Sequence, residues 1–129
     1  MRGLVVYDSL TGNVKRFVDK LGCRTVKVDE ALKVHEPYYL VTYTIGFGQP
    51  PLSTLRFLQE NGRYMMAVAS SGNRIWGANY ARAATVISAQ YGVPVLHTFE
   101  LSGSAEDVDR FLKEAERFGQ PNFQMDRAQ

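Results

Sequence analysis

Short apolar runs alternate with segments of helical periodicity along the whole chain. Continuous apolar runs at Leu4–Tyr7, Tyr38–Thr42, Tyr64–Ser70 and Val95–Phe99 predict buried strands. The segment Thr25–Asp29 alternates polar and apolar residues instead, which predicts a half-exposed strand at a sheet edge.

The segments between these strands carry the apolar spacing of helices, and a fourth such segment follows the last strand. We expect Gly22 and Gly62 to end the first two helices, and Ser104 with Asp107 to form a capping box at the last. The third helix is expected over Ala78–Tyr91. Each helix has an expected inward face: Val14, Phe17, Val18 and Leu21 in the first; Leu52, Leu55 and Leu58 in the second; Ala81, Ala84, Ile87 and Tyr91 in the third; and Val108, Phe111, Leu112, Ala115 and Phe118 in the fourth.

This alternation predicts an α/β fold: a three-layer sandwich around a five-stranded parallel sheet of order 2-1-3-4-5. The strand expected at the edge comes second in the chain, and the other strands are apolar enough to be central. We expect one domain over residues 1–119 and a polar, flexible tail over residues 120–129.

Glycine-bearing loops follow three strands that are neighbours in this order, over residues 8–13, 43–49 and 71–77. In such folds ligands bind at the carboxyl ends of the strands, near the switch point of the topology. The first loop joins a strand to a helix and carries hydroxyl and amide groups, which suits a phosphate. It lacks the Gly-Lys-Ser/Thr of a P-loop and the glycines of a dinucleotide loop. A capped turn without any ligand is the alternative.

The second and third loops add aromatic rings and glycines. Tyr43, Phe47 and Trp76 offer stacking faces, and the glycines expose backbone donors and acceptors. A planar heteroaromatic ligand needs this mixture. One molecule of FMN would use all three loops.

The three loops resemble the FMN loops of the NrdI family, a flavodoxin-like family. The matching segments are Ser9–Val14, Thr42–Gly48, Ala69–Gly77 and Phe99–Gly103, and their order and spacing hold across residues 4–118. Two positions depart from the common pattern: Ile45 replaces a threonine and Ile75 replaces an asparagine, and both changes remove a polar group near the flavin or at the mouth of its site.

The resemblance implies FMN as the cofactor. Gly46 would lie near flavin N5 and flip its peptide with the redox state. The residues that the resemblance and the loop pattern assign to FMN are Ser9, Leu10, Thr11, Gly12, Asn13, Val14, Thr42, Tyr43, Thr44, Gly46, Phe47, Gly48, Ser71, Gly72, Asn73, Trp76 and Gly77.

The resemblance also implies a partner and a reaction. NrdI proteins serve the class Ib ribonucleotide reductase: the reduced flavin reacts with O2, and superoxide or peroxide passes to the small subunit NrdF. There it oxidises a dimanganese centre on the way to the tyrosyl radical. The chain is therefore expected to be an accessory flavoprotein, supplied by an unidentified electron donor, and not a stand-alone metabolic enzyme.

Charge near the loops supports one further expectation. Asp8 is accompanied there by Lys15, Arg16 and Arg74, whereas flavodoxins usually surround FMN with acidic residues. A positive surround favours the anionic reduced flavin and attracts superoxide. We therefore expect the flavin hydroquinone to form more easily than in acidic flavodoxins.

Other functions fit the sequence less well. A generic flavodoxin that carries electrons between a reductase and an acceptor shares the fold and the cofactor, and it is the main alternative. An FMN-dependent reductase would need a roomy site for its substrate, of which the short loops give no sign. A receiver domain needs an aspartate where Thr42 stands, and a low-molecular-weight phosphatase needs a cysteine in the first loop.

Composition narrows the remaining classes. The 129 residues are 45% hydrophobic, and the net charge of +2 is too small to suggest nucleic acid. One cysteine, Cys23, and two histidines suggest neither a disulfide nor a metal site. No apolar run reaches the length of about 20 residues that spans a membrane, and the first residues do not form a signal peptide. We therefore expect a cytoplasmic protein.

Overall fold

Five parallel strands form one sheet of order β2-β1-β3-β4-β5, as the sequence predicts. The computed structural model describes residues 3–118, and the tail expected over 120–129 lies outside them. The strands are β1 (Leu4–Tyr7), β2 (Arg24–Lys27), β3 (Tyr38–Thr42), β4 (Met65–Gly72) and β5 (Val95–Glu100). The helices are α1 (Asn13–Asp19), α2 (Leu52–Asn61), α3 (Ala83–Tyr91) and α4 (Ala105–Phe118), with short 3-10 turns at Gly62–Tyr64 and Arg74–Asn79.

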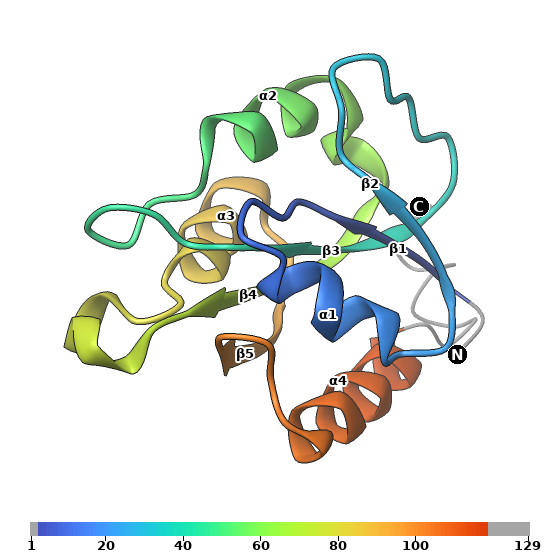
Figure 1. Cartoon of the computed structure of the whole chain (residues 1–129). Coiled ribbons are helices and arrows are strands. Elements are labelled where there is room, and N and C mark those ends of the chain that lie inside the picture. The colour runs from blue at the N-terminus through green and yellow to red at the C-terminus, as the bar shows by residue number, and fades with distance from the viewer. Residues whose placement is uncertain (1–2, 119–129) are drawn as a thin grey trace.

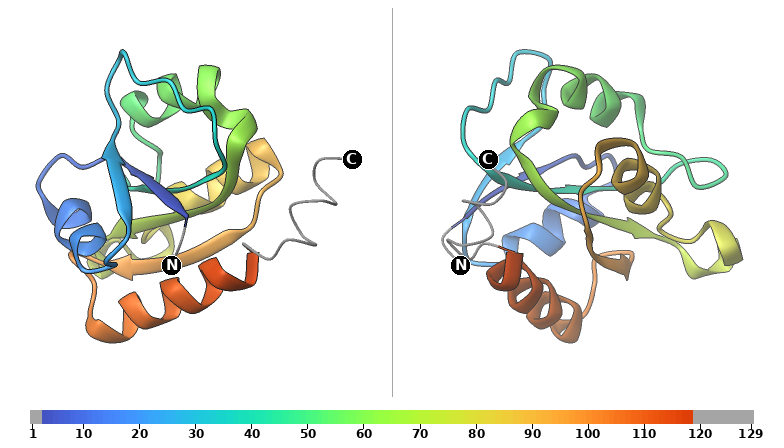
Figure 2. Two further views of the ribbon diagram at one scale, coloured as in Figure 1. Left: turned by 90° about the vertical axis from the view of Figure 1, so that its right-hand side faces the viewer. Right: turned by 180° about the vertical axis from the view of Figure 1, so that it is seen from behind.

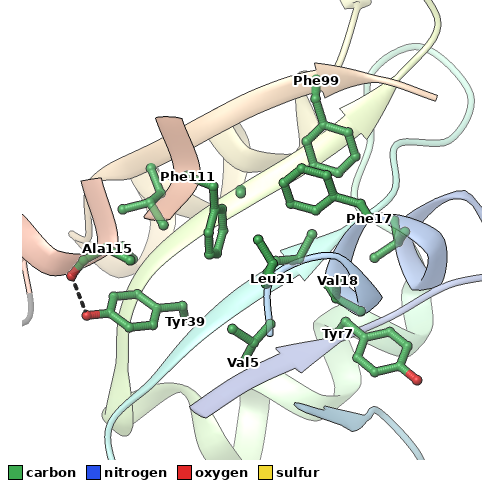
Figure 3. Close-up of a cluster of buried hydrophobic side chains, with 14 of the residues drawn as sticks. Val5, Tyr7, Phe17, Val18, Leu21, Tyr39, Phe99, Phe111 and Ala115 are labelled. Carbon is green, nitrogen blue, oxygen red and sulfur yellow. Dashed lines mark hydrogen bonds between the residues drawn. The ribbon is translucent and has the colours of Figure 1, made fainter. Parts of the chain in front are cut away.

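Helices cover both faces of the sheet. In Figure 1, α1 and α4 lie on one side and α2 and α3 on the other, and the turned views of Figure 2 show the same three layers. The core beneath α1 and α4 is aromatic: Phe17 stacks on Phe99 with ring centroids 3.9 Å apart and meets Phe111 edge-on (Figure 3). The Tyr39 hydroxyl in the same cluster donates a 2.7 Å hydrogen bond to the Ala115 carbonyl. In residues 3–118, no helix combines the length and the apolar character needed to cross a membrane.

The third helix begins at Ala83, so the expectation of a helix from Ala78 is wrong. Gly77 and Ala81 have positive φ angles of 59° and 50°, which interrupt helical geometry between the 3-10 turn and α3. The cause is tertiary, because this segment crosses β4 very closely. A Cβ atom at Gly72 would lie 2.3 Å from the backbone nitrogen of Ala81.

The inward face of α2 also differs from the expected one. Leu58 is buried as expected, but Leu52 is 64% exposed. Two polar residues, Thr54 and Asn61, are buried instead, together with Phe57. They face inward because each forms buried hydrogen bonds with residues distant in the sequence.

Candidate cofactor site

A cavity of about 350 Å³ opens at the carboxyl edge of the sheet. The loops that follow β1, β3 and β4 reach this edge, at the left of Figure 1. All three contribute to the cavity wall, so the predicted convergence of the three loops is observed. The lining residues are Ser9, Leu10, Thr11, Asn13, Val14, Tyr43, Thr44, Ile45, Gly46, Ser71, Gly72, Asn73, Trp76 and Leu101.

The first loop turns directly into α1. Gly12 takes a left-handed conformation with a φ of 91°, which residues with a Cβ rarely adopt, and the helix begins at the next residue, Asn13. The Ser9 hydroxyl accepts a 3.3 Å hydrogen bond from the Lys15 amide, which ties the loop to the first turn of α1. Ser9, Thr11 and Asn13 thus place hydroxyl and amide groups on one wall of the cavity.

The second loop closes on itself. The amide of Ile45 donates to the Gln49 carbonyl and the amide of Gln49 donates back to the Ile45 carbonyl, both at 2.8 Å. Gly46 and Gly48 have positive φ angles of 54° and 96° between these bonds. The peptide between Gly46 and Phe47 forms no hydrogen bond with any described residue.

The third loop holds its tryptophan by a local cap. The Asn73 side chain accepts a 3.1 Å hydrogen bond from the Ile75 amide, and the Asn73 carbonyl accepts one from the Trp76 amide at 3.0 Å. The resulting 3-10 turn brings Trp76 to the cavity while leaving its side chain 41% exposed. The indole can therefore contact a ligand on one side and solvent or a partner on the other.

Five of the seventeen residues assigned to the cofactor do not line the cavity. Thr42 is fully buried, and its hydroxyl lies 2.9 Å from that of Thr54. Phe47 is 82% exposed, at the tip of the second loop. Gly12, Gly48 and Gly77 shape the turns instead, since all three have positive φ. Their contact with a cofactor stays a prediction.

Two lining residues were not assigned to the cofactor from the sequence: Ile45 and Leu101. Leu101 follows β5 and brings a fourth loop to the cavity. Its φ of 54° is left-handed, which is strained for a leucine and usually persists only where surrounding contacts enforce it. The signal in the sequence was the match of Phe99–Gly103 to the family pattern.

The charges around the cavity are more balanced than the sequence suggests. Lys15 pairs with Asp19 at 2.7 Å, and Arg74 lies 3.6 Å from Glu100. Asp8 is buried and accepts hydrogen bonds from the Ser53 and Thr54 hydroxyls, at the start of α2. Of the three cations expected near the loops, Arg16 alone has no carboxylate partner among residues 3–118, so the expected excess of positive charge is not observed.

Comparison with known proteins identifies the family. The model of the NrdI flavodoxin-like family matches residues 5–113. The chain belongs to the NrdI family. It is 52% identical over 114 residues to Protein NrdI of Bacillus licheniformis, covering 88% of this chain and 87% of that protein. It is 37% identical to the SPbeta prophage-derived protein NrdI of Bacillus subtilis, covering 97% and 100% of the two chains.

Solved structures of flavodoxins have the same fold as this chain. Oxidised Flavodoxin 1 from Bacillus cereus superimposes with a TM-score of 0.68 at 18% identity, over 92% of this chain and 97% of that one. A Fusobacterium nucleatum flavodoxin mutant bound to flavin mononucleotide gives a TM-score of 0.58 at 17% identity, over 88% and 92%. The fold is therefore flavodoxin-like, as predicted.

The cavity fits the cofactor expected of this family. Its volume falls in the usual range of about 300–1,000 Å³ for small-molecule sites. Hydroxyl and amide groups lie on the wall from the first loop, and Tyr43, Ile45 and Trp76 supply apolar and aromatic surface on the others. The family, the fold and the cavity together support FMN as the cofactor.

Proposed function

We propose that this protein binds FMN at the carboxyl edge of its sheet and uses it to supply superoxide or peroxide, made from O2, to the class Ib ribonucleotide reductase subunit NrdF. The oxidant would serve the assembly of the dimanganese-tyrosyl radical cofactor. One observation carries the proposal: the loops that match the NrdI pattern meet in one cavity with exposed apolar side chains around it. With a single cysteine, the chain suits the reducing cytoplasm, where we place this role.

The residues of the three loops divide the binding task. Ser9, Thr11 and Asn13 would hold the phosphate, because their side chains and the backbone around Gly12 offer hydrogen-bonding groups on one wall. Tyr43 and Trp76 would flank the ring system, which the apolar and aromatic walls keep from bulk water. FMN held there, once reduced by a separate electron donor, would supply the electrons that reduce O2.

Gly46 would give the site its response to the redox state. Its peptide to Phe47 is free of hydrogen bonds within the described part of the chain, whereas the flanking residues Ile45 and Gln49 bond to each other. The peptide can therefore rotate without breaking the loop. A glycine carries no Cβ that would oppose either orientation.

The rim of the cavity suits a protein partner. Six exposed apolar side chains come from the four loops at this edge: Leu10, Ile45, Phe47, Ile75, Trp76 and Leu101. Exposed apolar groups concentrated at one face commonly mark a protein interface. Docking of NrdF on this rim would bring its metal site near the place where the oxidant forms.

The test is anaerobic reduction of the FMN-loaded protein, followed by exposure to air with manganese-loaded NrdF. We expect a tyrosyl radical in NrdF, measured by electron paramagnetic resonance, and little radical when either protein is left out. Reoxidation in air without radical would contradict the proposal. If the protein then passed electrons to an acceptor enzyme, the generic flavodoxin would be favoured. A protein that fails to bind FMN at all would remove both functions.

A further inference from the structure

Arg16 differs in its partners from Lys15 and Arg74, the two other cations expected near the loops. Lys15 and Arg74 each lie beside a carboxylate, but Arg16 pairs with no carboxylate in the part of the chain that the structure describes. Its guanidinium binds two neutral groups instead. Nη2 donates to the Asn13 side-chain oxygen at 2.7 Å, and Nε donates to the Ser102 hydroxyl at 3.0 Å.

These three side chains form a closed ring of hydrogen bonds. The Ser102 hydroxyl donates in turn to the same Asn13 oxygen, at 2.8 Å. Lys20 adds hydrogen bonds to the carbonyls of Ser102 and Gly103, at 3.2 and 3.1 Å. The ring therefore joins the first loop to the loop after β5, which both contribute residues to the cavity wall.

The ring also decides which way the Asn13 amide points. A guanidinium can only donate hydrogen bonds, so the Asn13 atom facing it must be the carbonyl oxygen. The amide nitrogen is then turned away from Arg16, and it has no partner among residues 3–118. Since Asn13 lines the cavity, its two N–H donors remain available to a ligand there.

The charge of Arg16 lies against the turn of the first loop. A Cβ atom at Gly12 would be 2.9 Å from Nη1, the guanidinium nitrogen that the ring does not use. A phosphate monoester carries a charge of about −1.5 to −2 at neutral pH. A positive charge beside this loop would favour a phosphorylated ligand over the same ligand without its phosphate.

We propose that Arg16 is a positioning residue that makes the first loop selective for a phosphorylated flavin. It fixes the Asn13 side chain with its amide nitrogen turned away from the guanidinium, and it adds a positive charge beside Gly12. The proposal rests on the proposed FMN site. Its prediction concerns the difference between two ligands with the same ring system, FMN and riboflavin.

The experiment measures dissociation constants of both ligands by quenching of flavin fluorescence. For Arg16→Gln we expect the affinity for FMN to fall by about tenfold or more, since the positive charge beside Gly12 and the bond that orients Asn13 are both lost. The affinity for riboflavin should change less than about twofold. Arg16→Lys keeps the charge without the fork of donors, so an intermediate loss of FMN affinity is expected. Added salt should weaken FMN binding more in the wild type than in Arg16→Gln.

Two further variants separate charge from position. Lys15→Gln removes the same charge from the same helix, but from a lysine already paired with Asp19, and should leave the ratio of the two affinities nearly unchanged. Ser102→Ala keeps the charge and breaks the ring, so FMN affinity should fall by a few-fold. Combining Ser102→Ala with Arg16→Gln should cost little more than Arg16→Gln alone, because both act through Asn13.

Two results would overturn the proposal. One is an equal loss of FMN and riboflavin affinity in Arg16→Gln, which would mean that Arg16 shapes the whole site. The other is an unchanged FMN affinity. Thermal unfolding of the flavin-free variants excludes a general loss of fold as the cause. Failure of the wild type to bind FMN would instead reject the proposed function, so the two failures are distinguishable.

Discussion

Two asparagines at opposite edges of the sheet differ in their hydrogen bonds. At the amino edge, the side-chain amide of Asn61 forms hydrogen bonds only within the protein. At the carboxyl edge, the amide nitrogen of Asn13 has no partner among the described residues. The Asn61 nitrogen donates to the carbonyls of Leu32 and Phe57, and its oxygen accepts from the Val34 amide at 2.8 Å. Its backbone carbonyl accepts from the buried Tyr38 hydroxyl. Burial raises the pKa of that hydroxyl, which keeps it a donor.

The two edges differ in the same way in their apolar groups. Of the eight large apolar side chains that are exposed in the described chain, six lie in the four loops at the carboxyl edge. Leu52 lies at the start of α2, and Val95 lies at the start of β5, at the opposite edge. The amino edge thus pairs the side chains of Asn61 and Tyr38 internally and exposes Val95 alone of these eight apolar groups. The carboxyl edge leaves polar and apolar groups available, which is what a site for a flavin and a protein partner requires.

The largest expected effect comes from truncating Asn61. Asn61→Ala should lower the free energy of unfolding by about 3 kcal/mol, because the buried Val34 amide loses its acceptor and two carbonyls lose their donor. Urea unfolding measures this loss. FMN affinity of the folded fraction should stay within about twofold.

Asn13→Ala is the matched change at the other edge. It should cost less than about 1 kcal/mol in stability, since its hydrogen bonds are exposed or only partly buried, and should weaken FMN binding clearly. A comparable stability loss in the two variants would contradict the distinction between the edges.

The next effect concerns the close approach at the end of β4. Gly72→Ala should lower the free energy of unfolding by about 2 kcal/mol, because the new methyl group would lie 2.3 Å from the Ala81 nitrogen and must displace this segment. FMN affinity should fall as well, since Gly72 lines the cavity.

Gly92→Ala provides the control for Gly72→Ala. Gly92 has a φ of 69° and open space around it, so only backbone strain of about 1 kcal/mol is expected. FMN binding should not change. Equal losses of stability with no loss of FMN affinity in Gly72→Ala would remove the role given to this contact.

The sequence predicted the strand order and the meeting of the three loops because both follow from local signals. Apolar runs identify the central strands, and parallel topology brings the loops after neighbouring strands to one edge. The start of α3 could not be predicted in this way. The alanines around Ala81 favour a helix, but their backbone conformation depends on contact with Gly72, which is nine residues away.

The prediction of the inward face of α2 was partly wrong for a related reason. Of the leucines expected to face inward, Leu58 is buried but Leu52 is exposed, and the buried face also includes Thr54 and Asn61, at a helical spacing of seven residues. Their burial depends on hydrogen-bond partners in other segments, Asp8 and Val34, which no local sequence pattern predicts. Leu101 was likewise missed as a lining residue, because its place at the cavity depends on a strained backbone after β5.

We expect a moderate loss of stability on substitution of Asp107. This residue shows that some polar groups on the carboxyl side of the molecule are also paired within the protein. Its carboxylate accepts from the amide and hydroxyl of Ser104 in the expected capping box and lies 2.7 Å from His97 Nε2. Burial would raise the pKa of Asp107, but the hydrogen bonds from His97 and Ser104 outweigh it and lower the pKa. Asp107→Asn should cost about 1 kcal/mol at neutral pH.

The pH dependence tests the cause of that loss. Because the folded state lowers this pKa, the associated stability is present above the ordinary aspartate pKa near 4 and is lost as the pH falls below it. The difference in unfolding free energy between wild type and Asp107→Asn should therefore shrink between about pH 5 and pH 3. Asp109→Asn, which removes an exposed pair with Lys113, should show no comparable trend. A difference that is constant with pH would contradict this account.

The smallest effect on the folded protein is expected at the rim. Ile75 is 83% exposed, so Ile75→Thr should change the free energy of unfolding by less than about 0.5 kcal/mol. If the rim binds NrdF, the same change should weaken that complex several-fold, because apolar area is lost from the interface. Val95→Thr removes a similar group at the opposite edge, where it should leave binding unchanged. Calorimetric titration of NrdF measures both. Equal binding of NrdF by the two variants would mean that the exposed apolar groups of the carboxyl edge contact the flavin alone. The difference between the two edges would then reflect flavin binding and not the docking of a protein partner.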